Sequence, residues 1–177
     1  MMNILITVAH PDDETIGMGG TIKKLSKNNE ITLCVMTDGA SAQYDGKKMI
    51  KVRQDACKKA GKILGISKFH FLNFPDMKLD SISHVEMNKE LEKIIKKINP
   101  KILYSTSYND LNKDHQKVFE SCSVISRPLS SKIKKFLCFE MGGRNKIPFN
   151  PNTYVDISKE LSFKLKALNQ YKTEINP

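Results

Sequence analysis

The chain has 177 residues, which is enough for one domain with a buried core and too few for two comfortable ones. Its formal net charge of +10 suggests nucleic-acid binding, but only 3 of its 29 basic residues are arginine, the residue best suited to bidentate phosphate contacts. No stretch approaches the roughly 18 apolar residues of a membrane-spanning helix, and the N-terminus does not have the form of a signal peptide. We therefore expect a single cytoplasmic domain over residues 1–177 that has no membrane span and no nucleic-acid partner.

The cysteine pattern argues against a disulfide framework and against a cysteine zinc site. The chain has 4 cysteines, and none of them forms a C-x-x-C pair. Cys34 and Cys138 fall in apolar, strand-like runs, where a cysteine behaves as a small buried hydrophobe. None lies beside a plausible base, so a catalytic cysteine is not expected either.

Strand-like and helix-like segments alternate along the chain. Continuous apolar or β-branched runs predict strands over residues 3–8, 31–37, 69–74, 101–106, 136–140 and 153–157. Helical spacing of apolar residues predicts helices over about 16–26, 47–64, 82–98, 115–125 and 158–171. Thr15 and Ser158 are expected to cap the first and the last of these helices. The alternation predicts an α/β, Rossmann-like fold with a mostly parallel sheet and helices on both faces.

Two loops of this predicted fold combine histidine with several acids. Ala-His-Pro-Asp-Asp-Glu follows the first strand at 9–14, and Ser-Tyr-Asn-Asp-Leu-Asn-Lys-Asp-His follows the fourth at 107–115. In parallel sheets the ligand binds outside the carboxyl ends of the strands, so both loops should lie at the binding edge. A cluster of acids there repels itself unless a cation is present. Either loop alone is equally well a polar turn, but together they favour a zinc site with histidine and carboxylate ligands.

Residues 10–14 resemble the A-H-P-D-D-E signature of the LmbE/PIG-L family of zinc-dependent sugar N-deacetylases. Residues 109–115 resemble the D-L-N-x-D-H motif of a subgroup, and the two motifs occur in the family's order. Thr-Asp-Gly at 37–39 and Phe-Pro-Asp at 74–76 also resemble family segments, and the similarity covers nearly the whole chain. The resemblance implies a hydrolase that removes the acetyl group from an N-acetylated amino sugar, either a small molecule or a glycan-linked one of the N-acetylglucosamine type.

The resemblance also implies roles for individual residues of the two motifs. His10, Asp13 and His115 are expected to bind Zn²⁺, and Fe²⁺ is an alternative because ligand type alone does not separate the two metals. Asp12 is expected to be the general base and then the proton donor to the leaving amine.

Two further residues of the second motif are expected to take part in catalysis. Asn112 stands where many family members have a histidine; it can donate a hydrogen bond but cannot shuttle a proton. More of the proton transfer is therefore assigned to Asp12. Asp114 is expected to orient a neighbouring side chain.

Three residues outside the two motifs are candidates for substrate binding. Asp38 and Asp76 end segments at the predicted binding edge, where they either contact the substrate or cap turns. Arg53 matches an arginine of the family's second helix, although the acid that often follows it is replaced by Ala56, and it could equally be a plain helix residue.

Other interpretations of the chain are a degenerate family member that binds a sugar or a metal without hydrolysis, and a nucleotide loop at Gly17, Gly19 and Gly20. The glycines lack the G-x-G-x-x-G spacing of a dinucleotide site, and the neighbouring acids would repel a pyrophosphate. Family chains usually continue beyond the Tyr171 region, so the chain to Pro177 is either truncated or has a more open site. The sequence identifies neither the sugar nor the oligomeric state.

Overall fold

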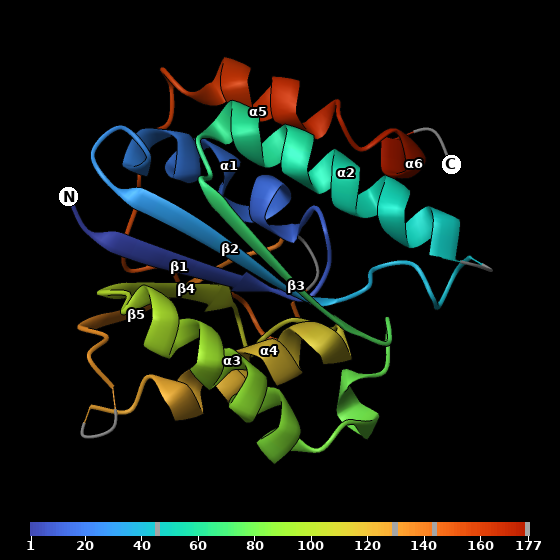
Figure 1. Cartoon of the computed structure of the whole chain (residues 1–177). Helices are drawn as coiled ribbons and strands as arrows, with labels where there is room; N and C mark the ends of the chain where they lie inside the picture. The colour runs from blue at the N-terminus through green and yellow to red at the C-terminus, as the bar shows by residue number, and fades with distance from the viewer. Residues whose placement is uncertain (45–46, 129–130, 143–144, 176–177) are drawn as a thin grey trace.

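The computed structural model describes residues 1–44, 47–128, 131–142 and 145–175 (Figure 1). Five strands form one parallel sheet in the order β3-β2-β1-β4-β5. The strands are β1 (Asn3–Val8), β2 (Glu30–Thr37), β3 (Lys68–Phe74), β4 (Ile102–Thr106) and β5 (Lys135–Phe139). The helices are α1 (Asp13–Leu25), α2 (Lys47–Leu64), the 3₁₀ turn η1 (Leu79–Ser81), α3 (His84–Ile98), α4 (Lys113–Ile125), α5 (Leu161–Leu168) and α6 (Lys172–Ile175).

The sheet is covered by helices on both faces. Helices α1, α2 and α5 lie on one side, and α3 and α4 lie on the other (Figure 1). Alternate residues of β1 enter two separate cores: Ile4 and Ile6 pack in the core that includes α2, whereas Leu5 packs in the core that includes α3. The predicted Rossmann-like α/β fold is therefore confirmed. None of the helices in the described part of the chain has the length and apolar character of a membrane span.

The central strand β1 determines where a ligand can bind. It pairs with β2 on one side and with β4 on the other. After β1 the chain adds β2 and β3 on one side of it, and then crosses back to add β4 and β5 on the other side, so the strand order reverses between β1 and β4. Loops that leave the two strands at such a point diverge and open a crevice at the carboxyl ends. The loops that follow β1 and β4 are the two in which histidine and acids are combined.

The segment 153–157 is not a strand, contrary to the prediction from its β-branched and aromatic residues. It pairs with no strand in the described part of the chain. Instead, Ile157 packs on α1 so closely that a Cβ added to Gly20 would lie 2.6 Å from its Cδ1 atom. The last helix was also predicted too early: Ser158 donates to Asp156 Oδ1 in a turn, and α5 begins only at Leu161. β-propensity reflects packing on a pleated surface, and here Ile157 packs on a helix while Tyr154 and Val155 are exposed.

The first helix begins earlier than predicted. α1 starts at Asp13 with Asp12 as its N-cap residue, rather than after Thr15. The Thr15 hydroxyl donates to Glu14 Oε1 at 2.6 Å instead of capping the helix. The chain therefore passes from β1 into α1 with only four residues between them, 9–12, which holds the signature acids close to the sheet.

Candidate active site and metal centre

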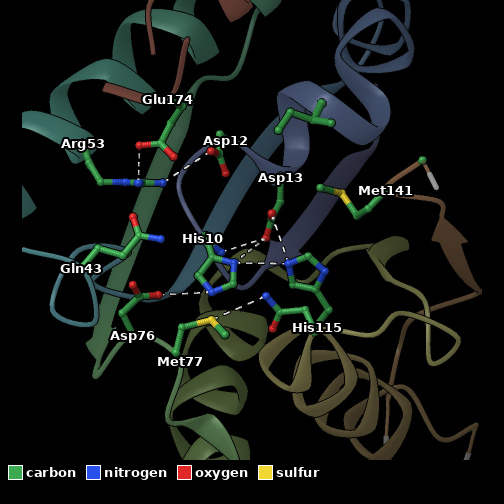
Figure 2. Close-up of a pocket in the computed structure, with 14 residues that line it drawn as sticks. His10, Asp12, Asp13, Gln43, Arg53, Asp76, Met77, His115, Met141 and Glu174 are labelled. Atoms are coloured by element: carbon green, nitrogen blue, oxygen red, sulfur yellow. Dashed lines mark hydrogen bonds and ion pairs between the residues drawn. The ribbon is translucent and has the colours of Figure 1, made fainter. Parts of the chain in front are cut away.

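Three side chains from the two loops meet at the carboxyl ends of β1 and β4 (Figure 2). The His10 Nδ1 atom lies 3.2 Å from His115 Nε2 and 3.5 Å from Asp13 Oδ2. The His115 Nε2 atom lies 3.3 Å from Asp13 Oδ1. One potential ligand atom from each residue lies within 4.8 Å of the others. Two imidazoles and one carboxylate form a donor set that suits zinc or iron(II), so these residues fit a metal ion.

Outer carboxylates orient both histidine rings. Asp110 Oδ2 lies 2.7 Å from His115 Nδ1, on the side of the ring opposite to the cluster. Asp114 Oδ2 and Asp76 Oδ1 lie 3.2 and 3.3 Å from His10 Nε2. When these outer nitrogens donate their protons to the carboxylates, His115 Nε2 and His10 Nδ1 present lone pairs to the cluster. This is the usual arrangement around a metal-binding histidine.

The carboxylates beside His10 Nε2 form a second group of possible ligands. His10, Asp76 and Asp114 also bring one atom each within 4.8 Å of the others. Asp114, however, is fully buried, and its two oxygens accept the backbone N–H groups of Met77 at 2.8 Å and Leu79 at 3.0 Å. This carboxylate is therefore engaged in holding the loop and the His10 ring. The His10–Asp13–His115 cluster, which faces the cavity, is the better candidate for a metal.

The charges in the cluster change the ionisation of its members. Burial alone would lower the pKa of His10, but Asp13, Asp114 and Asp76 together raise it well above its usual value. Burial likewise opposes protonation of His115, yet Asp13 and Asp110 raise its pKa to about 9. Burial would raise the pKa of Asp13, and the two histidines outweigh it and lower that pKa. The site thus favours positive charge next to Asp13, and a bound metal ion would take the place of the imidazole protons.

Asp12 lies beside the cluster without belonging to it. Its backbone has φ 146° and ψ −26°, a conformation that residues with a side chain rarely adopt and that is typical of strained functional positions. Burial and the neighbouring Asp13 raise the pKa of Asp12, while Arg53 opposes the rise. A carboxyl group whose pKa is raised in this way suits proton transfer near neutral pH.

Arg53 forms the wall of the site next to Asp12. Its side chain is only 6% exposed, and its Nη2 atom lies 3.4 Å from Asp12 Oδ2. The Nη1 atom donates to Glu174 Oε1 at 2.5 Å, so the arginine joins the first loop to the C-terminal helix α6. Arg53 is therefore not a plain surface residue, and its side chain reaches the cavity.

A cavity of about 460 Å³ opens over the cluster. It is lined by His10, Asp12, Asp13, Ile16, Gly39, Gln43, Arg53, Asp76, Met77, Asn112, His115, Met141, Gly142 and Glu174. Asn112 is also the N-cap of α4, where its Oδ1 atom accepts the N–H of Asp114 at 2.8 Å. Its amide nitrogen lies 3.6 Å from Met77 Sδ at the cavity wall.

Asp38 caps a turn, which is one of the two roles predicted for it. Its Oδ1 atom accepts the N–H groups of Ala40 and Ser41, both at 2.9 Å, and it is not among the described residues that line the cavity. The next residue, Gly39, has φ +63°, and an added Cβ would lie 2.2 Å from Pro11 Cδ. The Thr-Asp-Gly turn therefore acts by letting the loop after β1 pack closely against it.

Comparison with known proteins decides the family. The family described as PIG-L, GlcNAc-PI de-N-acetylase, matches residues 5–125. The chain belongs to the PIG-L family. It is accordingly a hydrolase that acts on amide bonds as a de-N-acetylase.

Relatives of this PIG-L chain include deacetylases from archaea and bacteria. It is 28% identical to the diacetylchitobiose deacetylase of Thermococcus kodakarensis, over 97% of this chain and 69% of the relative. It is 31% identical to the uncharacterized deacetylase YaiS of Escherichia coli, over 96% and 90% of the two chains. The structure of N,N'-diacetylchitobiose deacetylase from Pyrococcus horikoshii superimposes with a TM-score of 0.77 and 27% identity, over 98% of this chain and 70% of that one.

Two members of this PIG-L site were missed by the sequence analysis. Asp110 lies five residues before His115 within the second motif, and its position next to a predicted ligand was the available signal. Glu174 reaches the site only because α6 packs near α2, and no local pattern indicated this. The structure brings the other predicted residues together at one cavity, with the exceptions of Asp38 and the buried Asp114.

Proposed function

We propose that the chain is a zinc-dependent hydrolase that removes the acetyl group from an N-acetylated amino sugar of the N-acetylglucosamine type. The observation that supports this proposal best is the position of Asp12, on the cavity wall beside the His10–Asp13–His115 cluster and outside it. A protein that only binds a metal or a sugar does not need a second buried carboxyl group with a raised pKa at that place. An enzyme that moves a proton does.

The names of the relatives support the substrate class. One is a diacetylchitobiose deacetylase. Another is a probable N-acetyl-α-D-glucosaminyl L-malate deacetylase 2 of Bacillus anthracis, 26% identical over 58% of this chain and 49% of the relative. The two names share an N-acetyl sugar and differ in what is attached to it, so we assign the acetamido sugar to this site and leave the attached group to the specificity of the cavity wall.

The residues of the site divide the reaction between them. A divalent ion held by His10, Asp13 and His115 would polarise the amide carbonyl and lower the pKa of a water molecule, so that the water can lose a proton as it attacks the carbonyl carbon. Asp12 would accept the proton of the attacking water on a carboxylate oxygen and return it to the nitrogen of the leaving amine. Asn112 can donate a hydrogen bond from its amide nitrogen but cannot move a proton, so both transfers fall to Asp12.

The test compares the parent protein with Asp12→Asn and with Asp55→Asn, which makes the same chemical change at an exposed position of α2. Bound zinc and iron are counted, and acetate release is followed on N-acetylglucosamine, diacetylchitobiose and N-acetylglucosaminyl malate. We expect about one metal ion per chain in all three proteins and a fall in kcat of roughly 10²–10⁴-fold in Asp12→Asn alone.

Each other outcome has a definite meaning. Loss of the metal in Asp12→Asn would make this residue a ligand rather than the base. Bound metal without acetate release by the parent on any of the substrates would favour the degenerate binding protein. A parent protein that binds no metal would contradict the proposal.

A further inference from the structure

The guanidinium of Arg53 is already occupied by carboxylates of the protein. Nη1 is bonded to Glu174 at 2.5 Å, and Nη2 is 3.4 Å from Asp12 (Figure 2). The Arg53 side chain is 6% exposed, whereas that of Glu174 is 30% exposed and lines the cavity. The group that a substrate meets at this wall is therefore the carboxylate of Glu174 as well as the arginine behind it.

A buried anchor holds Glu174 in this position. The Tyr171 hydroxyl donates to Glu14 Oε1 at 2.7 Å, and Tyr171 is 3% exposed. Backbone N–H groups of Glu174 and Ile175 bond to the carbonyl of Tyr171 at 3.1 and 3.2 Å, which closes the short helix α6. Glu14 lies in the first turn of α1, two residues after Asp12, so the segment that carries Glu174 is fixed to the start of the same helix that Asp12 caps.

The cavity and the outer surface differ in charge. The chain has a formal net charge of +10, which attracts anions over a distance. Among the described residues that line the cavity, however, four are carboxylates, and apart from the two histidines of the proposed metal site Arg53 is the one basic side chain. The carboxylates are Asp12, Asp13, Asp76 and Glu174. Arg53 directs its Nη1 and Nη2 atoms to two of these, so the outer pair of nitrogens is engaged and the buried Nε–H is the donor left without a partner in the described structure.

We propose that Glu174 is a specificity-determining residue, which makes the site select N-acetyl sugars with uncharged attached groups over those that bear a carboxylate near Arg53. The proposal rests on the proposed deacetylase function and adds the class of attached group. Glu174 acts in two ways: it occupies the donors of Arg53 that would bind a substrate carboxylate, and it places a like charge next to that carboxylate. Discrimination of this kind comes from the cost imposed on the wrong ligand.

The experiment uses two substrates that share one sugar and one attached skeleton, N-acetyl-α-D-glucosaminyl L-malate and its dimethyl ester, in which two methyl groups remove the two negative charges. We compare kcat/KM for the two in the zinc-loaded parent and in Glu174→Gln, which keeps the size of the side chain and its ability to accept from Arg53. The parent is expected to prefer the diester. In Glu174→Gln the ratio should shift toward the diacid by about tenfold or more, mainly through a lower KM for the diacid.

Two matched variants separate this role from a structural one. Tyr171→Phe loosens the same segment without a change of charge, and it should change kcat/KM for both substrates by one common factor. Glu92→Gln removes a negative charge at an exposed position of α3, and it should leave the ratio as it is in the parent.

The remaining outcomes overturn the proposal in distinguishable ways. If the parent hydrolyses both substrates and Glu174→Gln leaves their ratio unchanged, or lowers both values in parallel, Glu174 has only a structural role and the proposed function stands. If the parent with bound zinc hydrolyses neither substrate, the specificity proposal fails together with the function on which it rests.

Discussion

The loops after β1 and β4 bring the same kinds of side chain to one point by different means. The loop after β1 is short, and its form depends on other parts of the chain: Pro11 packs on Gly39, and Arg53 contacts Asp12. The loop after β4 also contacts residues 145–148, but its own side chains add bonds within the loop. Asp110 Oδ1 accepts the N–H of Asn112 at 2.8 Å, and the Asn112 side chain then caps α4.

The two loops also differ in what they contribute to the chemistry. The first provides two proposed ligands, His10 and Asp13, and the proposed base between them. The second provides one ligand, His115, and the carboxylates of Asp110 and Asp114 that orient the two histidine rings. We therefore expect substitutions in the first loop to lower the rate of the reaction. Substitutions of the supporting residues in the second loop should lower zinc affinity and the free energy of unfolding in part. Asp12→Asn, described above, should have the largest effect.

Asp110→Asn tests the positioning role of the second loop. The amide keeps the size of the side chain and can still accept a hydrogen bond from His115 Nδ1, but the acceptor no longer carries a negative charge, so the bond is weaker. Replacement of such an outer partner typically costs 10–100-fold in metal affinity or activity, and we expect about this loss of zinc affinity. The measurement is competition for zinc with a chromophoric chelator, with the exposed Asp80→Asn as the control. Zinc affinity within about twofold of the parent would show that Asp110 does not support the ligand.

Gly39→Ala tests whether the first loop is held from outside. The alanine methyl group would clash with Pro11 at a positive φ, so we expect a loss of about 1–3 kcal/mol in the free energy of unfolding. Urea denaturation measures this loss. Gly142→Ala is a matched control, because Gly142 has φ +60° but nothing within 4 Å of an added Cβ. If the two variants lose the same amount, the contact with Pro11 contributes nothing and only backbone strain remains.

Asn112→Ala should give the smallest of these effects. It removes the side-chain bond to the N–H of Asp114 at the start of α4, for which we expect about 1 kcal/mol of lost stability. Asn112→Ser retains a capping oxygen and should recover most of it. A loss in Asn112→Ser equal to that in Asn112→Ala would mean that the cap is not what stabilises the second loop.

The sequence predicted the sheet well because a parallel strand buried on both faces is a continuous apolar run. β1 and β2 were found in this way, and the other three strands from shorter apolar, aromatic or β-branched runs, with boundaries close to those of the structure. The prediction of a strand over 153–157 was wrong: Ile157 packs on α1, and Tyr154 and Val155 are exposed rather than packed in a sheet. The two histidine-bearing loops could be placed at one edge because the carboxyl ends of parallel strands meet there. The ion pair of Arg53 with Glu174 depends on how α6 packs, and no local pattern encodes that.

The ring nitrogens of His10 and His115 lie 3.2 Å apart in space but 105 residues apart in the chain. They meet only after β4 has paired with β1, a contact between distant segments that forms slowly because a long loop must first close. During synthesis, a chain that ends before residue 115 has β1, β2 and β3 but lacks one of the proposed ligands. Metal capture would therefore report that β4 has joined β1, even before β5 is added, and it would stabilise chains in which this pairing has formed over those in which it has not.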